Sequence, residues 1–120
     1  MNGKLSDAEY HFLETVWEVE PIKSSALVKI CEEKFGWKKS TTYTVIKNLI
    51  KKDVLVNEET FVRSLVTRED IALHEGNKIA DKAFNGNMFD MFASFLQDRK
   101  LTKEEYLRLE ELINKAYKEE

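Results

Sequence analysis

The strongest constraint on the fold of this chain is a change in hydrophobic period after Asp53. Before that point, apolar residues recur at helical spacing in three short segments, at about 6–20, 24–35 and 40–52. After it come two short runs rich in β-branched residues, VLV at 54–56 and FVRSLVT at 61–67, separated by NEET. Such runs around a short polar turn predict a β-hairpin. Three helices followed by a hairpin predict a winged helix, in which the second and third helices form a helix-turn-helix.

Local signals mark where the first helices begin and end. Ser6 and Glu9 have the spacing of a capping box, in which each side chain binds the other residue's backbone N–H. Pro21 should end the first helix. We expect Ser24 to cap the second helix and Gly36 to stop it.

The second half of the chain is predicted to be helical from Asp70 onwards, with a break at FNGN, residues 84–87. In the next helix, apolar residues cover nearly two thirds of the circumference, so it should be buried on more than one side. Thr102 and Glu105 form a second capping box, ahead of a helix with one apolar stripe. The overall fold class is therefore mainly α, with a winged-helix DNA-binding domain at 1–70 and a helical dimerisation domain at 71–120.

Residues 71–120 carry a large apolar area, yet about 50 residues rarely support an independent core. Packing of two copies would bury this area, so we expect a homodimer; the alternative is that the segment folds back onto the first half. The residues expected to form the dimer interface are Met88, Phe89, Met91, Phe92, Phe95, Leu96, Leu109, Leu112 and Ile113.

Charge is distributed unevenly along the chain. The formal net charge is -3, but residues 34–52 contain six lysines and no acidic residue, which leaves -9 for the rest (-3 minus +6). A local basic patch on an acidic protein favours an anionic partner that binds at one place. The simpler alternative is a helix face that is only solvated.

The third helix carries most of this patch and has two distinct faces. At 100° per residue, Thr42, Val45, Ile46 and Leu49 fall on one side, where a buried stripe would lie. The opposite side presents hydroxyls, an aromatic ring, an amide and lysines, without the glutamates that usually pair with lysine on a solvated helix. Hydroxyl and tyrosine side chains reach phosphates and base edges, and lysines add electrostatic attraction. The predicted DNA-binding residues are Lys39, Ser40, Thr41, Tyr43, Thr44, Lys47 and Lys51.

No arrangement in the sequence indicates an enzyme, a cofactor or a metal site. His11 and His74 lie on separate predicted helices, and neither has a second histidine or cysteine at ligand spacing. Cys31, the single cysteine, lies in an apolar pattern and is expected to be a small core residue. No apolar run approaches the roughly 20 residues of a membrane span, and residues 1–4 are polar, so we expect a cytoplasmic protein without membrane insertion.

Four stretches resemble, in order, motifs of the penicillinase repressor family. They are LSDAEYHFLETVW, WKKSTTYTVIKNLIKKDVL, FNGNMFDMFASFL and LTKEEYLRLEELI, and the correspondence runs from Leu5 to about Tyr117. The resemblance implies a homodimeric transcriptional repressor that binds palindromic operators. It also implies control of antibiotic-resistance or related stress genes, such as those for β-lactamase, a penicillin-binding protein or copper export.

The resemblance further implies a mechanism of relief. In many members a membrane sensor metalloprotease is activated and cuts the repressor in its dimerisation helix, at a bond that corresponds here to Ser94–Phe95. Serine replaces the usual asparagine. The CxC pairs of copper-responsive relatives are absent, so direct copper sensing is not expected.

Two departures from the family pattern concern the predicted hairpin at 54–67, which would form the wing of the winged helix, and the residue just before it. Asp53 stands where relatives often have glycine, and the turn NEET is acidic where relatives have basic loops. Glu58 and Glu59 would repel phosphates, so the wing should add little affinity. The acidic wing also supports a rival hypothesis, a protein-interaction module of the same fold that has lost DNA binding.

Overall fold

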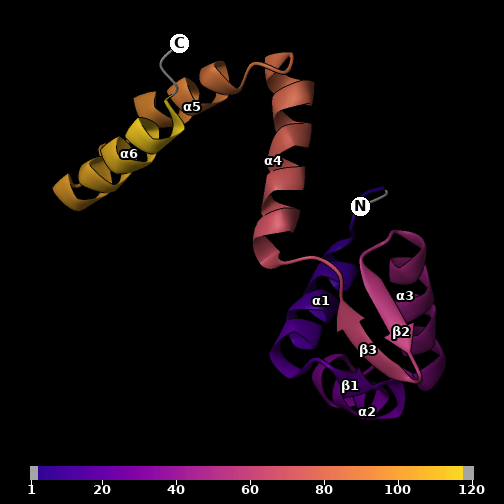
Figure 1. Cartoon of the computed structure of the whole chain (residues 1–120). Coiled ribbons are helices and arrows are strands. Elements are labelled where there is room, and N and C mark those ends of the chain that lie inside the picture. Colours follow the sequence, from indigo (N-terminus) through magenta and orange to yellow (C-terminus); the bar gives the residue numbers. More distant parts are fainter. Residues whose placement is uncertain (1–2, 118–120) are drawn as a thin grey trace. The chain divides into compact units, whose positions relative to one another are not determined.

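The computed structural model describes residues 3–117. The chain divides into two compact units, Met1–Leu73 and His74–Glu120 (Figure 1). Helix α4 crosses from one unit into the other, so the expected functional division at residue 70 stays a prediction.

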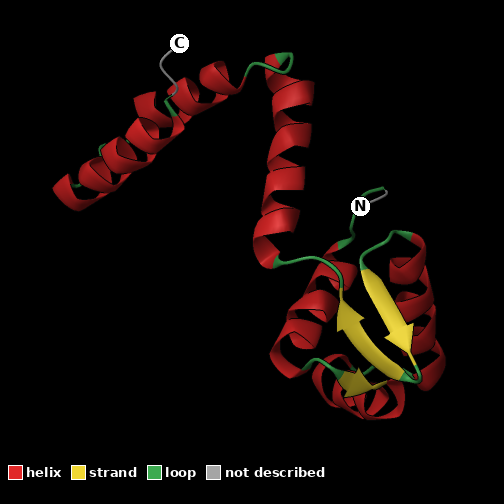
Figure 2. Cartoon of the chain, viewed as in Figure 1, coloured by secondary structure: helices red, strands yellow, loops and turns green. Residues whose placement is uncertain are grey.

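The first unit is a winged helix in which three helices pack against a small antiparallel sheet (Figure 2). The sheet has the strand order β1–β3–β2, and Val62 in its central strand pairs with both Ile22 and Asn57. The hairpin is therefore confirmed, but β1 was not predicted, because a two-residue strand is too short to show a period. The elements are α1 (Asp7–Val19), β1 (Ile22–Lys23), α2 (Ser24–Phe35), α3 (Lys39–Lys51), β2 (Leu55–Glu58) and β3 (Phe61–Ser64).

The ends of α1 and α2 test the expected caps. The Glu9 N–H donates to Ser6 Oγ at 3.1 Å, and the Ser6 N–H donates to Glu9 Oε1 at 2.9 Å, which confirms the capping box. Gly36 ends α2 with a left-handed φ of 68°, also as expected. The expected cap at Ser24 is wrong: Ser24 is the first residue of α2, and its N–H donates to the Thr60 carbonyl at 2.8 Å. Strand β1 runs directly into α2, so Lys23 occupies the N-cap position, and the turn of the hairpin accepts the Ser24 N–H.

The core of the first unit is formed by α1, α2, α3 and the sheet, together with the start of α4. Cys31 belongs to this core, as predicted, and burial raises the pKa of its thiol. Buried hydrophobic residues of the core are Leu5, Phe12, Leu13, Val16, Leu27, Cys31, Ile46, Leu49, Val54, Leu55, Val62 and Ile71.

Three helices, α4 (Arg68–Phe84), α5 (Met88–Gln97) and α6 (Lys103–Ala116), follow in the rest of the described chain. Helix α4 begins two residues earlier than expected, because Thr67 and Asp70 cap its start. The Thr67 N–H donates to Asp70 Oδ2 at 2.9 Å, and the Asp70 N–H donates to Thr67 Oγ1 at 3.1 Å. The predicted break follows, with positive φ at Asn85 and Gly86. The capping box of Thr102 and Glu105 is also confirmed.

The helices of the second unit bury little surface within a single chain. Among its described residues, the only buried hydrophobic side chains are Ala80 and Met91. Burial of α5 on more than one side therefore does not occur in the single chain.

Candidate nucleic-acid interface

The turn between α2 and α3 sets the position of the predicted DNA-reading helix. Gly36 reverses the chain, and the Trp37 N–H donates to the Cys31 carbonyl at 3.4 Å. The Trp37 ring stacks on Phe12, with centroids 6.0 Å apart, and its centroid is 4.8 Å from that of Phe35. These aromatic contacts tie the turn to α1 and α2, so the start of α3 is held by the core.

Helix α3 has the two faces that its sequence predicts. Thr42, Ile46 and Leu49 are buried, and Val45 is half-buried against the core. The helical period therefore brings the predicted DNA-binding residues together on the remaining surface. Exposed residues of α3 on this surface are Lys39, Ser40, Thr41, Tyr43, Thr44, Lys47 and Lys51.

The first turn of α3 provides backbone donors beside these side chains. Its N-cap residue, Lys38, makes no side-chain cap hydrogen bond. The N-terminal end of a helix attracts anions, because its first N–H groups have no partner within the helix and carry the positive end of the helix dipole. Lys38 and Lys39 flank this end, and the Lys39 amine lies 5.9 Å from the centre of the Tyr43 ring. A DNA phosphate fits this environment.

Packing separates the six lysines of the basic stretch into two groups. Lys52 Nζ lies 2.8 Å from Glu9 Oε1 and donates to the Lys4 carbonyl at 2.7 Å. Lys34 Nζ donates to Thr15 Oγ1 at 3.2 Å and lies 3.8 Å from Glu18 Oε2. Both lysines therefore have partners within the first unit. In contrast, no described residue forms an ion pair with any of the other four, which are Lys38, Lys39, Lys47 and Lys51.

The ion pair between Glu9 and Lys52 joins the cap of α1 to the end of α3. Burial by itself raises the pKa of the Glu9 carboxyl, but hydrogen bonds from Lys52 and from the Ser6 N–H outweigh it and leave the pKa below its usual value. The partners are 43 residues apart in the sequence. No local pattern could have shown this contact.

The turn between the two strands of the wing is shorter than the sequence suggests. The strands extend into NEET, so the turn consists of Glu59 and Thr60, both with positive φ as in a type I′ turn. Asp53, just before β2, also has a positive φ of 59°, a conformation that glycine adopts more easily. Of the two acidic residues, Glu58 is paired with Arg63, with 2.8 Å between Oε1 and Nη2.

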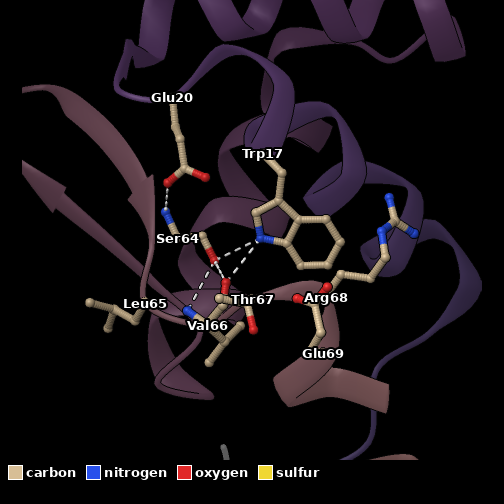
Figure 3. Close-up of a pocket in the computed structure, with 8 residues that line it drawn as sticks. All are labelled: Trp17, Glu20, Ser64, Leu65, Val66, Thr67, Arg68 and Glu69. Carbon is tan, nitrogen blue, oxygen red and sulfur yellow. Dashed lines mark hydrogen bonds between the residues drawn. The ribbon is translucent and has the colours of Figure 1, made fainter. Parts of the chain in front are cut away.

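The base of the wing is fixed to α1 by Trp17 (Figure 3). The indole N–H lies 3.1 Å from Ser64 Oγ and 3.0 Å from the Val66 carbonyl, and Glu20 accepts the Ser64 N–H at 2.8 Å. The Arg68 guanidinium lies 5.1 Å from the centre of the indole ring. These residues line a shallow pocket of about 460 Å³. No pattern in the sequence indicates this cluster, because its members come from α1, β3 and the start of α4.

The predicted dimerisation residues lie on α5 and α6, which form an apolar groove of about 380 Å³. Met91 is buried, whereas Phe89 is 76% exposed and lies outside the groove. Of the other predicted residues, Met88 is partly buried on α5. The groove is lined by Phe92, Phe95, Leu96, Leu109, Leu112, Ile113 and Ala116.

The predicted cleavage bond, Ser94–Phe95, lies within α5, and both residues are exposed.

Across residues 3–117, no cluster of three or more His, Cys, Asp or Glu side chains is arranged to hold a metal ion. No helix in that part of the chain is both long and apolar enough to cross a membrane.

A winged helix whose third helix exposes hydroxyl, aromatic and lysine side chains defines a DNA-binding protein of the helix-turn-helix class. Comparison with known families is more specific, because the model of the penicillinase repressors matches residues 5–115. The chain belongs to this family, and it is a DNA-binding transcriptional repressor.

Individual relatives are distant. The penicillinase repressor of Bacillus licheniformis is 24% identical over 114 residues, which cover 92% of this chain and 89% of that protein. The solution structure of the DNA-binding domain of the repressor BlaI is 25% identical, with a TM-score of 0.50, and the match covers 56% of this chain and 87% of that one. A second solution structure is that of the monomeric form of Bacillus licheniformis BlaI in complex with the blaP half-operator. It is 24% identical, with a TM-score of 0.49, over 57% of this chain and 88% of that one.

Proposed function

We propose that the protein is a homodimeric repressor that places one α3 helix in each half of a palindromic operator. The observation that carries this proposal is the exposed face of α3, which combines hydroxyls, Tyr43 and unpaired lysines without any carboxylate. A two-fold symmetric dimer reads two equivalent half-sites, so the operator should have the same symmetry.

Residues on this face have separate proposed roles. Ser40, Thr41, Tyr43 and Thr44 are short or planar side chains on the first two turns of α3, and we assign to them contacts with base edges and nearby phosphates. The lysines, Lys39, Lys47 and Lys51, would contact phosphates and supply affinity that depends on salt but not on sequence.

The proposed dimer interface is the apolar groove of α5 and α6. Its rings and aliphatic side chains remain exposed in the single chain, and a second copy offers a matching apolar surface. Joining two readers strengthens operator binding, because the second half-site is then bound at a high effective concentration.

The regulated genes are inferred from the relatives. The Bacillus licheniformis relative is a penicillinase repressor, and we infer that this protein controls antibiotic-resistance or related stress genes. A repressor acts where the DNA is, so we infer a cytoplasmic location. Operator binding requires neither catalysis nor a cofactor, and we propose neither.

Relief of repression by proteolysis is proposed at Ser94–Phe95. The bond lies inside α5, so a protease needs local opening of this helix before it can cut. Cleavage there would damage the dimerisation surface and leave α3 intact. A membrane sensor metalloprotease is the proposed partner for this step.

The test is a binding titration with DNA from upstream of the protein's own gene, against random DNA of equal length and composition. We expect tighter binding to the upstream DNA at physiological salt, with a footprint of two symmetric half-sites. Equal, weak binding to both DNAs would contradict the proposal and favour an interaction module that has lost DNA binding.

A further inference from the structure

The outer face of the wing carries charges that the proposed function does not use. In β3, Val62 is buried, so its neighbours Phe61 and Arg63 point to the opposite, solvent-exposed face of the sheet. By register, Lys23 and Glu58 both lie opposite Phe61. The exposed Phe61 ring is thus flanked by side chains of opposite charge.

These charges balance within the wing. Arg63 forms the ion pair with Glu58, and the Lys23 amine lies 5.9 Å from the centre of the Phe61 ring. With Glu59 in the turn, the exposed face of the sheet carries two cations, Lys23 and Arg63, and two carboxylates. Helix α3, in contrast, carries lysines and no acidic residue.

The position of the wing makes its charge relevant to DNA. The chain reverses between α3 and β2, so the wing turn and the first turn of α3 lie at the same end of the first unit (Figure 1). DNA bound at the first turn of α3 would therefore pass close to the wing turn.

We infer that Glu58 limits the sequence-independent affinity for DNA by neutralising Arg63. This inference rests on the proposed function. Both side chains of the pair are about half exposed, and such surface pairs are weak, so a phosphate can compete for Arg63. If it does, the Glu58 carboxylate is left beside the phosphate without its partner. In either arrangement the wing gains little from approaching DNA, and binding depends on α3.

Replacing Glu58 with glutamine should release Arg63 to bind a phosphate. One added contact steepens the dependence of log K on log salt by about 0.9, which corresponds to roughly eight-fold tighter binding at 0.1 M salt. Operator and random DNA should both gain by this factor, because the base contacts of α3 do not change. Discrimination between the two DNAs should therefore stay constant.

The experiment measures affinity against salt concentration for the wild type, Glu58→Gln, Glu59→Gln and the double variant Glu58→Gln/Arg63→Gln. Glu59→Gln is the matched control, since it removes an equal charge from the neighbouring residue but the Glu59 carboxylate forms an ion pair with no described residue. We expect the steeper slope and the tighter binding in Glu58→Gln alone. Circular dichroism melts verify that each variant is folded.

Three outcomes would overturn the inference: an unchanged slope in Glu58→Gln, an equal gain in Glu59→Gln, or a gain that survives in the double variant. A further variant, Lys47→Ala on α3, shows whether only the role of Glu58 is wrong or whether the proposed DNA binding is wrong as well. If Lys47→Ala flattens the slope and the wing variants do not respond, only the role of Glu58 is wrong. If the wild type shows no salt-dependent binding to DNA, the proposed function fails, and the role of Glu58 fails with it.

Discussion

The groove of α5 and α6 allows us to work out how much free energy of dimerisation one substitution, Phe92→Ala, should remove. Phe92 lines the groove and keeps 53% of its surface exposed in the single chain. A phenylalanine buries about 200 Å² when it is fully covered, so about 100 Å² of Phe92 is left for a second copy to cover. At about 25 cal/mol per Å², this area is worth about 2.5 kcal/mol.

A two-fold interface contains each residue twice. Phe92→Ala should therefore cost up to about 5 kcal/mol per dimer, which is a loss of up to about 4 × 10³-fold in the dimerisation constant. Sedimentation equilibrium over a range of concentrations measures this constant. The wild type should be dimeric at micromolar concentration, and the variant should sediment at the 14.1 kDa of a monomer.

Leu107→Ala is the control for this experiment. Leu107 is also on α6 and is 50% exposed, but it does not line the groove. Its substitution should leave the dimer within about ten-fold of the wild type, because the lost apolar area lies elsewhere. A dimer that is unaffected by Phe92→Ala, or weakened as much by Leu107→Ala, would refute the assignment of the groove as the interface.

Helix α3 gives two further predictions, and the cap of α1 and the middle of α5 give one each. Thr44→Ala should reduce discrimination between operator and random DNA by about 1–3 kcal/mol if the hydroxyl reads a base, measured by competition binding; unchanged discrimination would exclude this role. Lys47→Ala should weaken binding to both DNAs alike and flatten the salt slope by about 0.9. Glu9→Gln should lower the free energy of unfolding at pH 7 by about 1–3 kcal/mol, because it removes the charge that the lysine at the end of α3 binds. The pKa of Glu9 is lowered in the folded protein, so the wild type loses this stability as the pH falls through that pKa. The two proteins should converge in urea unfolding once the pH is below the folded-state pKa of Glu9. Mass spectrometry of the repressor from induced cells should show two fragments, one that ends at Ser94 and one that begins at Phe95. Intact protein that has left its operator would contradict cleavage and point to relief by a small ligand or a partner.

The sequence was sufficient for most helix ends, which depend on residues close together in the chain. The capping boxes at Ser6 and Thr102, the stop at Gly36 and the break after Phe84 were all predicted, because a helix end is decided by side chains within one turn. The two faces of α3 were predicted for the same reason, since 3.6 residues per turn fixes which side chains share a side.

Tertiary structure decided which charges and apolar groups remain free to act. Six lysines in one stretch are equivalent in the sequence, yet packing places Lys52 on Glu9 and Lys34 beside Thr15 and Glu18. The two-residue strand β1 exists only because β3 lies beside it. The groove of α5 and α6 likewise appears only when the two helices lie together, and the rings of Phe92 and Phe95 that line it stay exposed in the single chain. Each of these outcomes depends on groups that are distant in the chain, and only folding brings such groups within contact distance.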